Sequence, residues 1–152
     1  MDRIAAVALG SNLGDRRSHL DFAAVRLGAL LSSFTISSYI DTEAVGVAEP
    51  QPPYLNAVAV GRTGLPPREL LDALLAIERE RGRERPFAEA PRTLDLDLIL
   101  LGDVIVDEPG LRVPHPRFRE RRFVLEPLAS IAPELRDPVS GLTIGALLRR
   151  LP

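Results

Sequence analysis

Apolar and polar residues alternate along the chain with two different periods, which predict strands and helices in turn. Period-two alternation is typical of a strand that is buried on one face. It occurs over three segments: Ile4–Gly10, Phe34–Asp41 and Tyr54–Arg62. Apolar residues spaced by three and four positions are typical of amphipathic helices. This spacing predicts two helices, one over Arg16–Leu31 and one from Pro67 to about Arg81.

A further strand is predicted over Leu94–Leu101, and its pattern is the most informative in the chain. Successive side chains of a strand point to opposite faces. We therefore expect four leucines on one face: Leu94, Leu96, Leu98 and Leu100. Asp95 and Asp97 would share the other face. Their Cα atoms would lie about 6.5 Å apart, which is two strand rises of roughly 3.3 Å each.

The remaining segments complete one domain. A short strand is expected within Asp103–Asp107, a bend at Pro114–Pro116, and helices over Arg121–Ser130 and Ile144–Leu151. The order β-α-β-β-α-β is typical of the ferredoxin-like arrangement. We therefore predict an α+β fold with a mainly antiparallel sheet, helices packed on it and additional C-terminal helices. With no repeat and no break in composition, residues 1–152 are expected to form a single domain.

Composition narrows the class of protein. The chain has 152 residues, a formal net charge of −2 and no cysteine, so disulfides and thiolate metal sites are excluded. It contains no run near 18 apolar residues and no signal-peptide layout at its start, so no membrane association is expected. The net charge predicts no general attraction to nucleic acid. A cytoplasmic soluble protein is the simplest expectation.

The basic residues are unusual in kind and in position. All 19 are arginine, and ten of them lie between Arg79 and Arg122. The planar guanidinium group suits phosphate and is always charged. Without lysine, the chain cannot contain a P-loop of the usual kind. A coding bias explains the missing lysine, but it does not explain the clustering of the arginines.

The paired aspartates are the first candidate for chemistry. Two carboxylates this close repel each other unless they are protonated or bridged by cations. Beside arginines, Asp95 and Asp97 indicate magnesium that holds a phosphate chain. The alternative is an amphipathic edge strand whose two aspartates simply face solvent.

Besides Thr42 with the proline-rich segment 43–53, three other patches carry side chains suited to a ligand. Tyr54 and Asn56 share one strand face, so a ring and an amide could together bind a flat heterocycle. The irregular segment 82–92 contains further arginines that could neutralise a transferred phosphoryl group. His115 lies between two prolines that stiffen its backbone. Each patch also has a structural interpretation: a rim tyrosine, a solvated ion-paired loop and a structural histidine. The other histidine, His19, is expected at the surface.

In this order, the patches resemble the 6-hydroxymethyl-7,8-dihydropterin pyrophosphokinase family of folate biosynthesis. The matching segments are Ala8–Asp15 (ALGSNLGD), Tyr54–Ala57 (YLNA), Glu78 with Gly82-Arg83, Pro91–Asp97 (PRTLDLD), Val113–Arg117 (VPHPR) and Phe123–Leu128 (FVLEPL). They span nearly the whole chain. The resemblance implies transfer of the pyrophosphoryl group of ATP to the hydroxymethyl group of the pterin, with release of AMP. It also implies two Mg²⁺ ions held by Asp95 and Asp97.

The resemblance further implies a role for individual residues. The pterin would lie between the rings of Tyr54 and Phe123. Its polar edge would be read by Asn56, Thr42 and the backbone of Ala44, Val45 and Gly46, with Asp95 close by. The ATP-binding residues would be Arg85, Arg92, Leu98, Arg112, His115 and Arg121. Arg83 and Arg92 would stabilise the transition state beside the catalytic aspartates.

The chain departs from the family pattern in its irregular segments. Many members carry Arg-Trp-Gly shortly before the Pro-Arg of the aspartate motif, where this chain has Ala88-Glu89-Ala90. Arg85 and Phe87 are the available substitutes. Two other classes of protein stay open at this stage: an inactive nucleotide- or pterin-binding module of the same fold, and a metal-dependent phosphoesterase. A monomer is the default oligomeric state.

Overall fold

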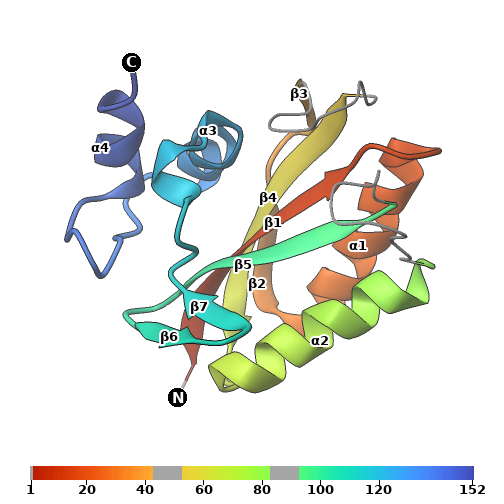
Figure 1. The fold of residues 1–152 in the computed structure, drawn as a ribbon, viewed down its shortest axis with the longest axis horizontal. Coiled ribbons are helices and arrows are strands. Elements are labelled where there is room, and N and C mark those ends of the chain that lie inside the picture. Colours follow the sequence, from red (N-terminus) through yellow and green to blue (C-terminus); the bar gives the residue numbers. More distant parts are fainter. Residues whose placement is uncertain (1, 43–52, 83–92) are drawn as a thin grey trace.

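The core of the protein is an antiparallel sheet with strand β1 (Arg3–Ser11) at its centre. The computed structural model describes residues 2–42, 53–82 and 93–152. The strands follow the order β2-β4-β1-β5, with β3 paired to the far end of β4. Their bounds are β2 Ser32–Ile36, β3 Ile40–Thr42, β4 Tyr54–Thr63 and β5 Asp95–Leu101. Strand β5, which carries the aspartates, is therefore an edge strand of the sheet (Figure 1).

Two long helices cover one face of the sheet: α1 (Arg16–Leu30) and α2 (Pro67–Glu80). Helix α1 begins at Asp15, whose side chain accepts a hydrogen bond from the Ser18 backbone N–H at 3.1 Å. Helix α2 ends before Gly82, which adopts a positive φ of 74°, as expected of a glycine after a helix. The buried side chains between this face and the two helices include Val7, Leu9, Leu20, Leu27, Leu70 and Leu74.

The C-terminal part of the chain covers part of the opposite face. It contains a 3₁₀ turn, η1 (Phe118–Glu120), and helices α3 (Arg122–Ile131) and α4 (Ile144–Arg149). Its buried side chains meet those of the sheet in a second cluster: Ala6, Val58, Ile99, Leu100, Phe118, Val124, Leu125, Leu128, Ile144 and Leu147. A small hairpin, β6 (Val106–Glu108) with β7 (Leu111–Val113), lies beside β5 and α2 (Figure 1). The predicted α+β fold with ferredoxin-like order and extra C-terminal helices is confirmed.

The segment expected to be one strand over Phe34–Asp41 is in fact two strands, β2 and β3. The break falls at Ser37, whose side chain is buried. Its hydroxyl accepts a hydrogen bond from the Val58 backbone N–H at 2.9 Å. A side chain thus replaces a backbone partner in the ladder, so the regular pairing with β4 stops and restarts.

The expected alternation in β5 holds only for its first half. Leu94, Leu96 and Leu98 lie in the cluster under α1 and α2, but Leu100 lies in the cluster under α3. The register against β1 shifts between Ala6 and Val7, which is typical of a β-bulge. One extra residue reverses the faces of all that follow, so the prediction for Leu100 was wrong.

His19, which we expect at the surface, keeps part of its side chain exposed there. This side chain is half-buried, and its Nδ1 accepts a hydrogen bond from the Arg81 Nε–H at 2.8 Å. It therefore links the start of α1 to the residue that follows α2. Among the described residues, no helix combines the length and the apolar character that crossing a membrane requires.

Candidate active site

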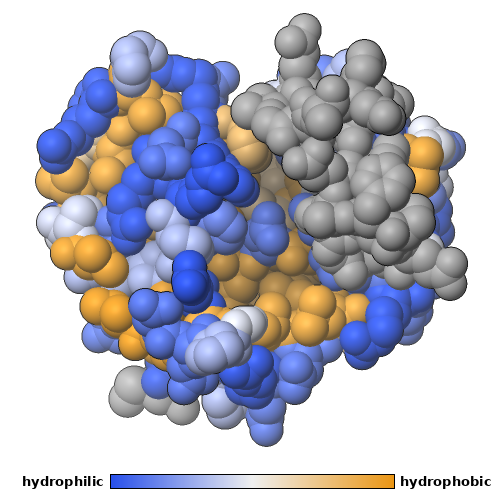
Figure 2. Space-filling model, viewed as in Figure 1, coloured by the Kyte–Doolittle hydropathy of each residue, from blue (hydrophilic) through white to orange (hydrophobic). Residues whose placement is uncertain are grey.

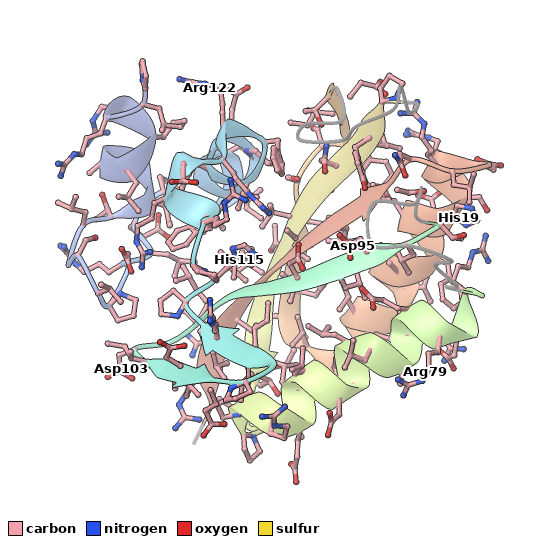
Figure 3. The ribbon with its side chains drawn as sticks, in the orientation of Figure 1. His19, Arg79, Asp95, Asp103, His115 and Arg122 are labelled. Carbon is pink, nitrogen blue, oxygen red and sulfur yellow. The ribbon has the colours of Figure 1, made fainter. Side chains whose placement is uncertain are left out.

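The two aspartates lie on the sheet face that α3 covers in part. Asp97 pairs with Ala8 and Asp95 with Gly10 across the β1–β5 ladder. Both side chains are half-buried, while Leu96 between them is buried against the other face. This arrangement confirms that the carboxylates share one face, opposite the leucine side chains of the same segment. Figure 3 shows Asp95 on the part of β5 that lies away from the C-terminal helices.

The polar residues predicted to read a heterocycle lie on the same face. Asn56 pairs with Gly10 on one side of β1, and Asp95 pairs with Gly10 on the other. These three residues form a row across β4, β1 and β5. Asn56 and Asp95 are thus separated by two interstrand spacings, or about 9.6 Å. Tyr54 lies two residues from Asn56 on β4 and faces the same way.

Gly10 leaves an open place in this row. A Cβ atom on Gly10 would lie 3.3 Å from Asn56 Oδ1 and 3.4 Å from Tyr54 Cδ1. A side chain here would therefore press on both the amide and the ring. Because Gly10 has no side chain, nothing projects from β1 between the amide on β4 and the carboxylate on β5.

The amide of Asn56 is held by a neighbouring strand. Its Nδ2–H donates to Thr42 Oγ1 on β3 at 2.5 Å, and the residue is only 7% exposed. The structure thus brings together Thr42, Tyr54 and Asn56, as predicted. The hydrogen bond orients the amide, so that its oxygen lies on the side of Gly10.

His115 is fixed at the open edge of β5. Its backbone N–H donates to the Ile99 carbonyl at 2.9 Å, and its Nδ1 accepts from the Arg117 backbone N–H at 3.1 Å. Burial, followed by the nearby positive charge of Arg121, lowers the pKa of His115 to about 4, although Asp95 acts in the opposite direction. The imidazole is therefore neutral at pH 7 and carries its proton on Nε2, a hydrogen-bond donor.

Arg121 and Phe123 stand at the start of α3. The guanidinium carbon of Arg121 lies 5.6 Å from the centroid of the Phe123 ring, which is a cation–π distance. Both residues are half-buried. Because α3 packs over β4, they belong to the same side of the sheet as Tyr54 and Asn56. The predicted neighbourhood of a ring, an arginine and a histidine is therefore present.

A cavity of about 320 Å³ lies at the edge of β5, between α2, the β6–β7 hairpin and His115. Leu98 and Asp97 line it from β5. Arg112 lines it from β7, and its exposed guanidinium pairs with Asp107 at 3.2 Å. The other lining residues are Leu71, Leu96, Gly110, Leu111, Val113, His115 and Pro116. Figure 2 shows this face of the molecule hollowed, with apolar atoms at the floor of the hollow.

Several of the predicted site residues lie outside the described residues. They are Ala44, Val45 and Gly46 of the predicted pterin site, and Arg83, Arg85 and Arg92 of the predicted ATP and transition-state sites. Their proposed roles stay predictions.

Two carboxylates are enough for Mg²⁺, which substrate and water also coordinate, but too few for a metal ion that protein side chains alone must coordinate. Magnesium is usually held by one or two carboxylates together with substrate phosphates and water. Within the described part of the chain, no group of three or more histidine, cysteine or acidic side chains could hold a metal ion. Asp95 and Asp97 thus provide the donor set expected for Mg²⁺ that arrives with a phosphate chain.

Sequence reasoning missed two residues of this region. Gly10 was noted only as part of a motif, although a glycine inside a predicted strand is itself a signal of close approach. Glu78 was also noted without a role, yet its carboxylate lies beneath β5, 2% exposed, and accepts a hydrogen bond from the Leu96 backbone N–H. An acidic residue among the apolar positions of a helix was the available signal.

A sheet face with two carboxylates, an oriented amide and a neutral histidine beside an arginine is suited to an enzyme that binds a phosphorylated ligand. Comparison with known proteins agrees with this class. Residues 6–133 match the model of the 7,8-dihydro-6-hydroxymethylpterin-pyrophosphokinase family. The chain therefore belongs to this family, and it is an ATP-dependent pyrophosphokinase of folate biosynthesis.

Curated relatives support this assignment over most of the chain. The 2-amino-4-hydroxy-6-hydroxymethyldihydropteridine pyrophosphokinase of Synechocystis is 44% identical over 97% of this chain and 75% of its own length. That of Pseudomonas aeruginosa is 43% identical over 96% of this chain and 90% of its own length. That of Bacillus subtilis is 42% identical over 93% and 85%.

The fold is similar to that of solved structures. Plasmodium falciparum HPPK-DHPS crystallised with pteroate superposes with a TM-score of 0.75 at 14% identity. The match covers 99% of this chain but only 42% of that larger chain. At this identity the likeness shows the fold alone.

Proposed function

We propose that the row Asn56–Gly10–Asp95 and the cavity beyond Asp97 together bind the two substrates of pyrophosphoryl transfer. The pterin ring lies on the β4 side, where the amide of Asn56 and the hydroxyl of Thr42 read its polar edge. Tyr54 and Phe123 provide rings that stack on it. The backbone of residues 44–46 completes this contact.

ATP lies on the β5 side in this proposal. The cavity of about 320 Å³ that Leu98 and Arg112 help to line is the site proposed for the base. The neutral imidazole of His115 donates its Nε2–H to the nucleotide. Arg121 and Arg85 neutralise phosphate charge, and Arg83 and Arg92 stabilise the charge that grows in the transition state.

The reaction is a displacement at the β-phosphorus of ATP. The hydroxymethyl oxygen of the pterin forms a bond to this phosphorus, and the bond to the α,β-bridging oxygen breaks. AMP leaves with the electron pair, and the hydroxyl proton passes to water. In this proposal the acceptor lies on the β4 side and the phosphates lie on the β5 side, and the pairing of Gly10 with both Asn56 and Asp95 supports it. This alignment is the observation that carries the proposal.

Asp95 and Asp97 would hold two Mg²⁺ ions between them. When bound, magnesium supplies positive charge to the phosphate oxygens and lowers the pKa of a coordinated hydroxyl. The contribution of the chain is to hold both carboxylates on one face at a fixed spacing, close to His115 and Arg121.

The test is to mix the protein with ATP, Mg²⁺ and 6-hydroxymethyl-7,8-dihydropterin and to measure AMP. We expect AMP in proportion to pterin consumed. Asp97→Asn should lower kcat by at least about a hundredfold, because a lost metal ligand removes charge stabilisation in the transition state. The matched control is Asp103→Asn, an exposed aspartate just beyond β5, which should retain full activity.

Three outcomes would favour other functions. Release of ADP in place of AMP would indicate a different transfer. Binding of ATP with no turnover would indicate an inactive module of the same fold. Phosphate release that does not depend on the pterin would favour a phosphoesterase.

We further propose that residues 1–152 act as one domain, as a cytoplasmic monomer with no nucleic-acid partner. The large apolar side chains that are exposed among the described residues support the monomer, because they are scattered singly. They are Leu13, Val25, Ile105 and Val139. Light scattering coupled to size exclusion should give one species near 16.6 kDa.

A further inference from the structure

A carboxylate from α2 lies beneath the aspartate strand. Glu78 is 2% exposed, and its Oε2 accepts a hydrogen bond from the Leu96 backbone N–H at 2.7 Å. Burial of an acidic side chain is costly, so it needs a compensating contact. One such contact is made with the backbone of β5.

The position of β5 explains why such a contact is needed. Among the described residues, strand β5 pairs with another strand, β1, on one side only. In an antiparallel ladder, the backbone groups of alternate residues point toward the partner strand and away from it. The Leu96 N–H donates to α2, so it points to the open edge. Glu78 gives this edge donor the acceptor that a neighbouring strand would otherwise provide.

The anchored residue has a particular place in the site. Leu96 lies between Asp95 and Asp97, and Asp95 is the first residue of β5. Ends of strands open more readily than their middles. The two carboxylates also repel each other when no cation is bound. An anchor at Leu96 holds both aspartates at once, because their side chains extend from the residues on either side.

We propose that Glu78 is a positioning residue that fixes the spacing of the two metal-binding aspartates through the Leu96 backbone. This inference rests on the proposed function of Asp95 and Asp97. Glu78 itself touches neither substrate in this proposal. Its effect should appear first in the amount of Mg²⁺ needed to bind nucleotide, because loss of a contact that orients metal ligands typically costs about 10- to 100-fold in affinity or activity.

Three variants distinguish an effect of the hydrogen bond to Leu96 from an effect of the negative charge on Glu78. Glu78→Gln keeps an acceptor oxygen at the same distance but removes the charge. Glu78→Asp keeps the charge but withdraws the acceptor by one methylene group. Glu78→Ala removes both. If the hydrogen bond to Leu96 matters, the glutamine variant should stay close to wild type, whereas the aspartate and alanine variants should not.

The matched control is Leu74→Ala, one turn earlier on α2. Leu74 is fully buried in the cluster under the sheet, so its loss also destabilises the protein. It makes no contact with the edge of β5 through a polar group. An effect shared by Leu74→Ala and Glu78→Ala would therefore reflect stability alone.

The experiment uses the whole chain and two measurements besides turnover. Calorimetry measures binding of α,β-methylene-ATP at increasing Mg²⁺, and amide hydrogen exchange measures opening at Leu96. We expect Glu78→Ala and Glu78→Asp to raise the half-saturating Mg²⁺ concentration by about tenfold or more and to speed exchange at Leu96. We expect Glu78→Gln to remain within about threefold of wild type, and Leu74→Ala to leave the Mg²⁺ requirement unchanged.

The proposal is overturned if Glu78→Ala or Glu78→Asp keeps the wild-type Mg²⁺ requirement, or if Leu74→Ala shifts it equally. It is also overturned if Glu78→Gln raises the Mg²⁺ requirement and Glu78→Asp does not, because the charge of Glu78 would then be the cause. AMP formation by the wild type is measured first. Its absence would defeat the proposed function itself, whereas normal turnover with unaffected Glu78 variants would defeat only the positioning role.

Discussion

Gly10 shows how a missing side chain can shape a site. It lies at the crossing of two ladders, with Asn56 on one side and Asp95 on the other. A Cβ would lie 3.3 Å from Asn56 Oδ1, which is tighter than ordinary van der Waals contact, and 3.4 Å from Tyr54 Cδ1, which is at its limit. Any larger residue would move the very groups proposed to hold the pterin.

We predict that Gly10→Ala raises the KM for the pterin by about tenfold, which corresponds to an overpacking cost of about 1.4 kcal/mol. The KM for ATP should change little, because the cavity at the edge of β5 is not touched. The control is Gly28→Ala in α1, where a Cβ would lie 3.7 Å from Phe34, an ordinary contact. Equal pterin KM values for wild type and Gly10→Ala would contradict this role.

His115 predicts a pH dependence of stability. Its pKa is lowered to about 4 in the folded protein, from an ordinary value of 6.5, mainly by burial. Between these values the unfolded chain takes up a proton that the folded chain does not. The contribution of neutral His115 to the free energy of unfolding is therefore fully present above pH 6.5. It is lost as the pH falls from 6.5 toward 4.

Between pH 7 and pH 5, the free energy of unfolding should fall by about 1 kcal/mol less in His115→Gln than in wild type. This value is smaller than full burial would give, because the imidazole is partly exposed to water. Urea unfolding at the two pH values measures the difference. Parallel pH profiles for the two proteins would show that His115 does not titrate as inferred.

At the level of secondary structure, the connection between α3 and α4 is organised around one buried carboxylate. Asp137 is fully buried and pairs with Arg119 through two hydrogen bonds, of 2.5 and 2.8 Å. It also accepts from the Ser140 hydroxyl and the Val139 backbone N–H. Although burial alone would raise the pKa of Asp137, these hydrogen bonds lower it to about 2.

We predict that Asp137→Ala lowers the free energy of unfolding by about 3 kcal/mol at pH 7, because it leaves Arg119 without its buried partner. The difference from wild type should shrink as the pH falls from about 4 toward 2, because Asp137 takes up its proton near pH 3.8 in the unfolded chain but only near pH 2 in the folded protein. Denaturant titration measures both effects. Since this connection lies away from the aspartates of β5, the KM for each substrate should be unchanged.

For the molecule as a whole, the sheet joins two hydrophobic clusters into one cooperative unit. Strands β1, β4 and β5 each send some side chains to the cluster under α1 and α2 and others to the cluster under α3 and α4. Unfolding of either set of helices would expose one face of the same three strands. Folding of the two layers is therefore expected to be coupled.

This coupling is testable with the two tyrosines, Tyr39 and Tyr54, which both lie on the β3–β4 side of the sheet. We predict that urea unfolding followed by tyrosine fluorescence and by far-UV circular dichroism gives one coincident transition. Asp137→Ala, in the C-terminal layer, should move both signals by the same amount. A shift in circular dichroism alone would show that the C-terminal layer unfolds separately.

Local pattern was enough to predict the order of strands and helices, the shared face of Asp95 and Asp97, and the family motifs. Those features depend on residue spacing of two or of three to four, which neighbouring residues set through backbone geometry. Pattern failed where a contact between distant segments altered the backbone. Ser37 split a predicted strand by bonding to β4, and a bulge against β1 carried Leu100 to the other face.

Only the tertiary structure brings together segments that lie far apart in the sequence. The row of Asn56, Gly10 and Asp95 exists because β1 pairs with β4 and β5 in a particular register. The anchor from Glu78 to Leu96 exists because α2 packs beneath an edge strand. Register and packing minimise a free energy summed over the whole chain, so no short segment contains the information that sets them.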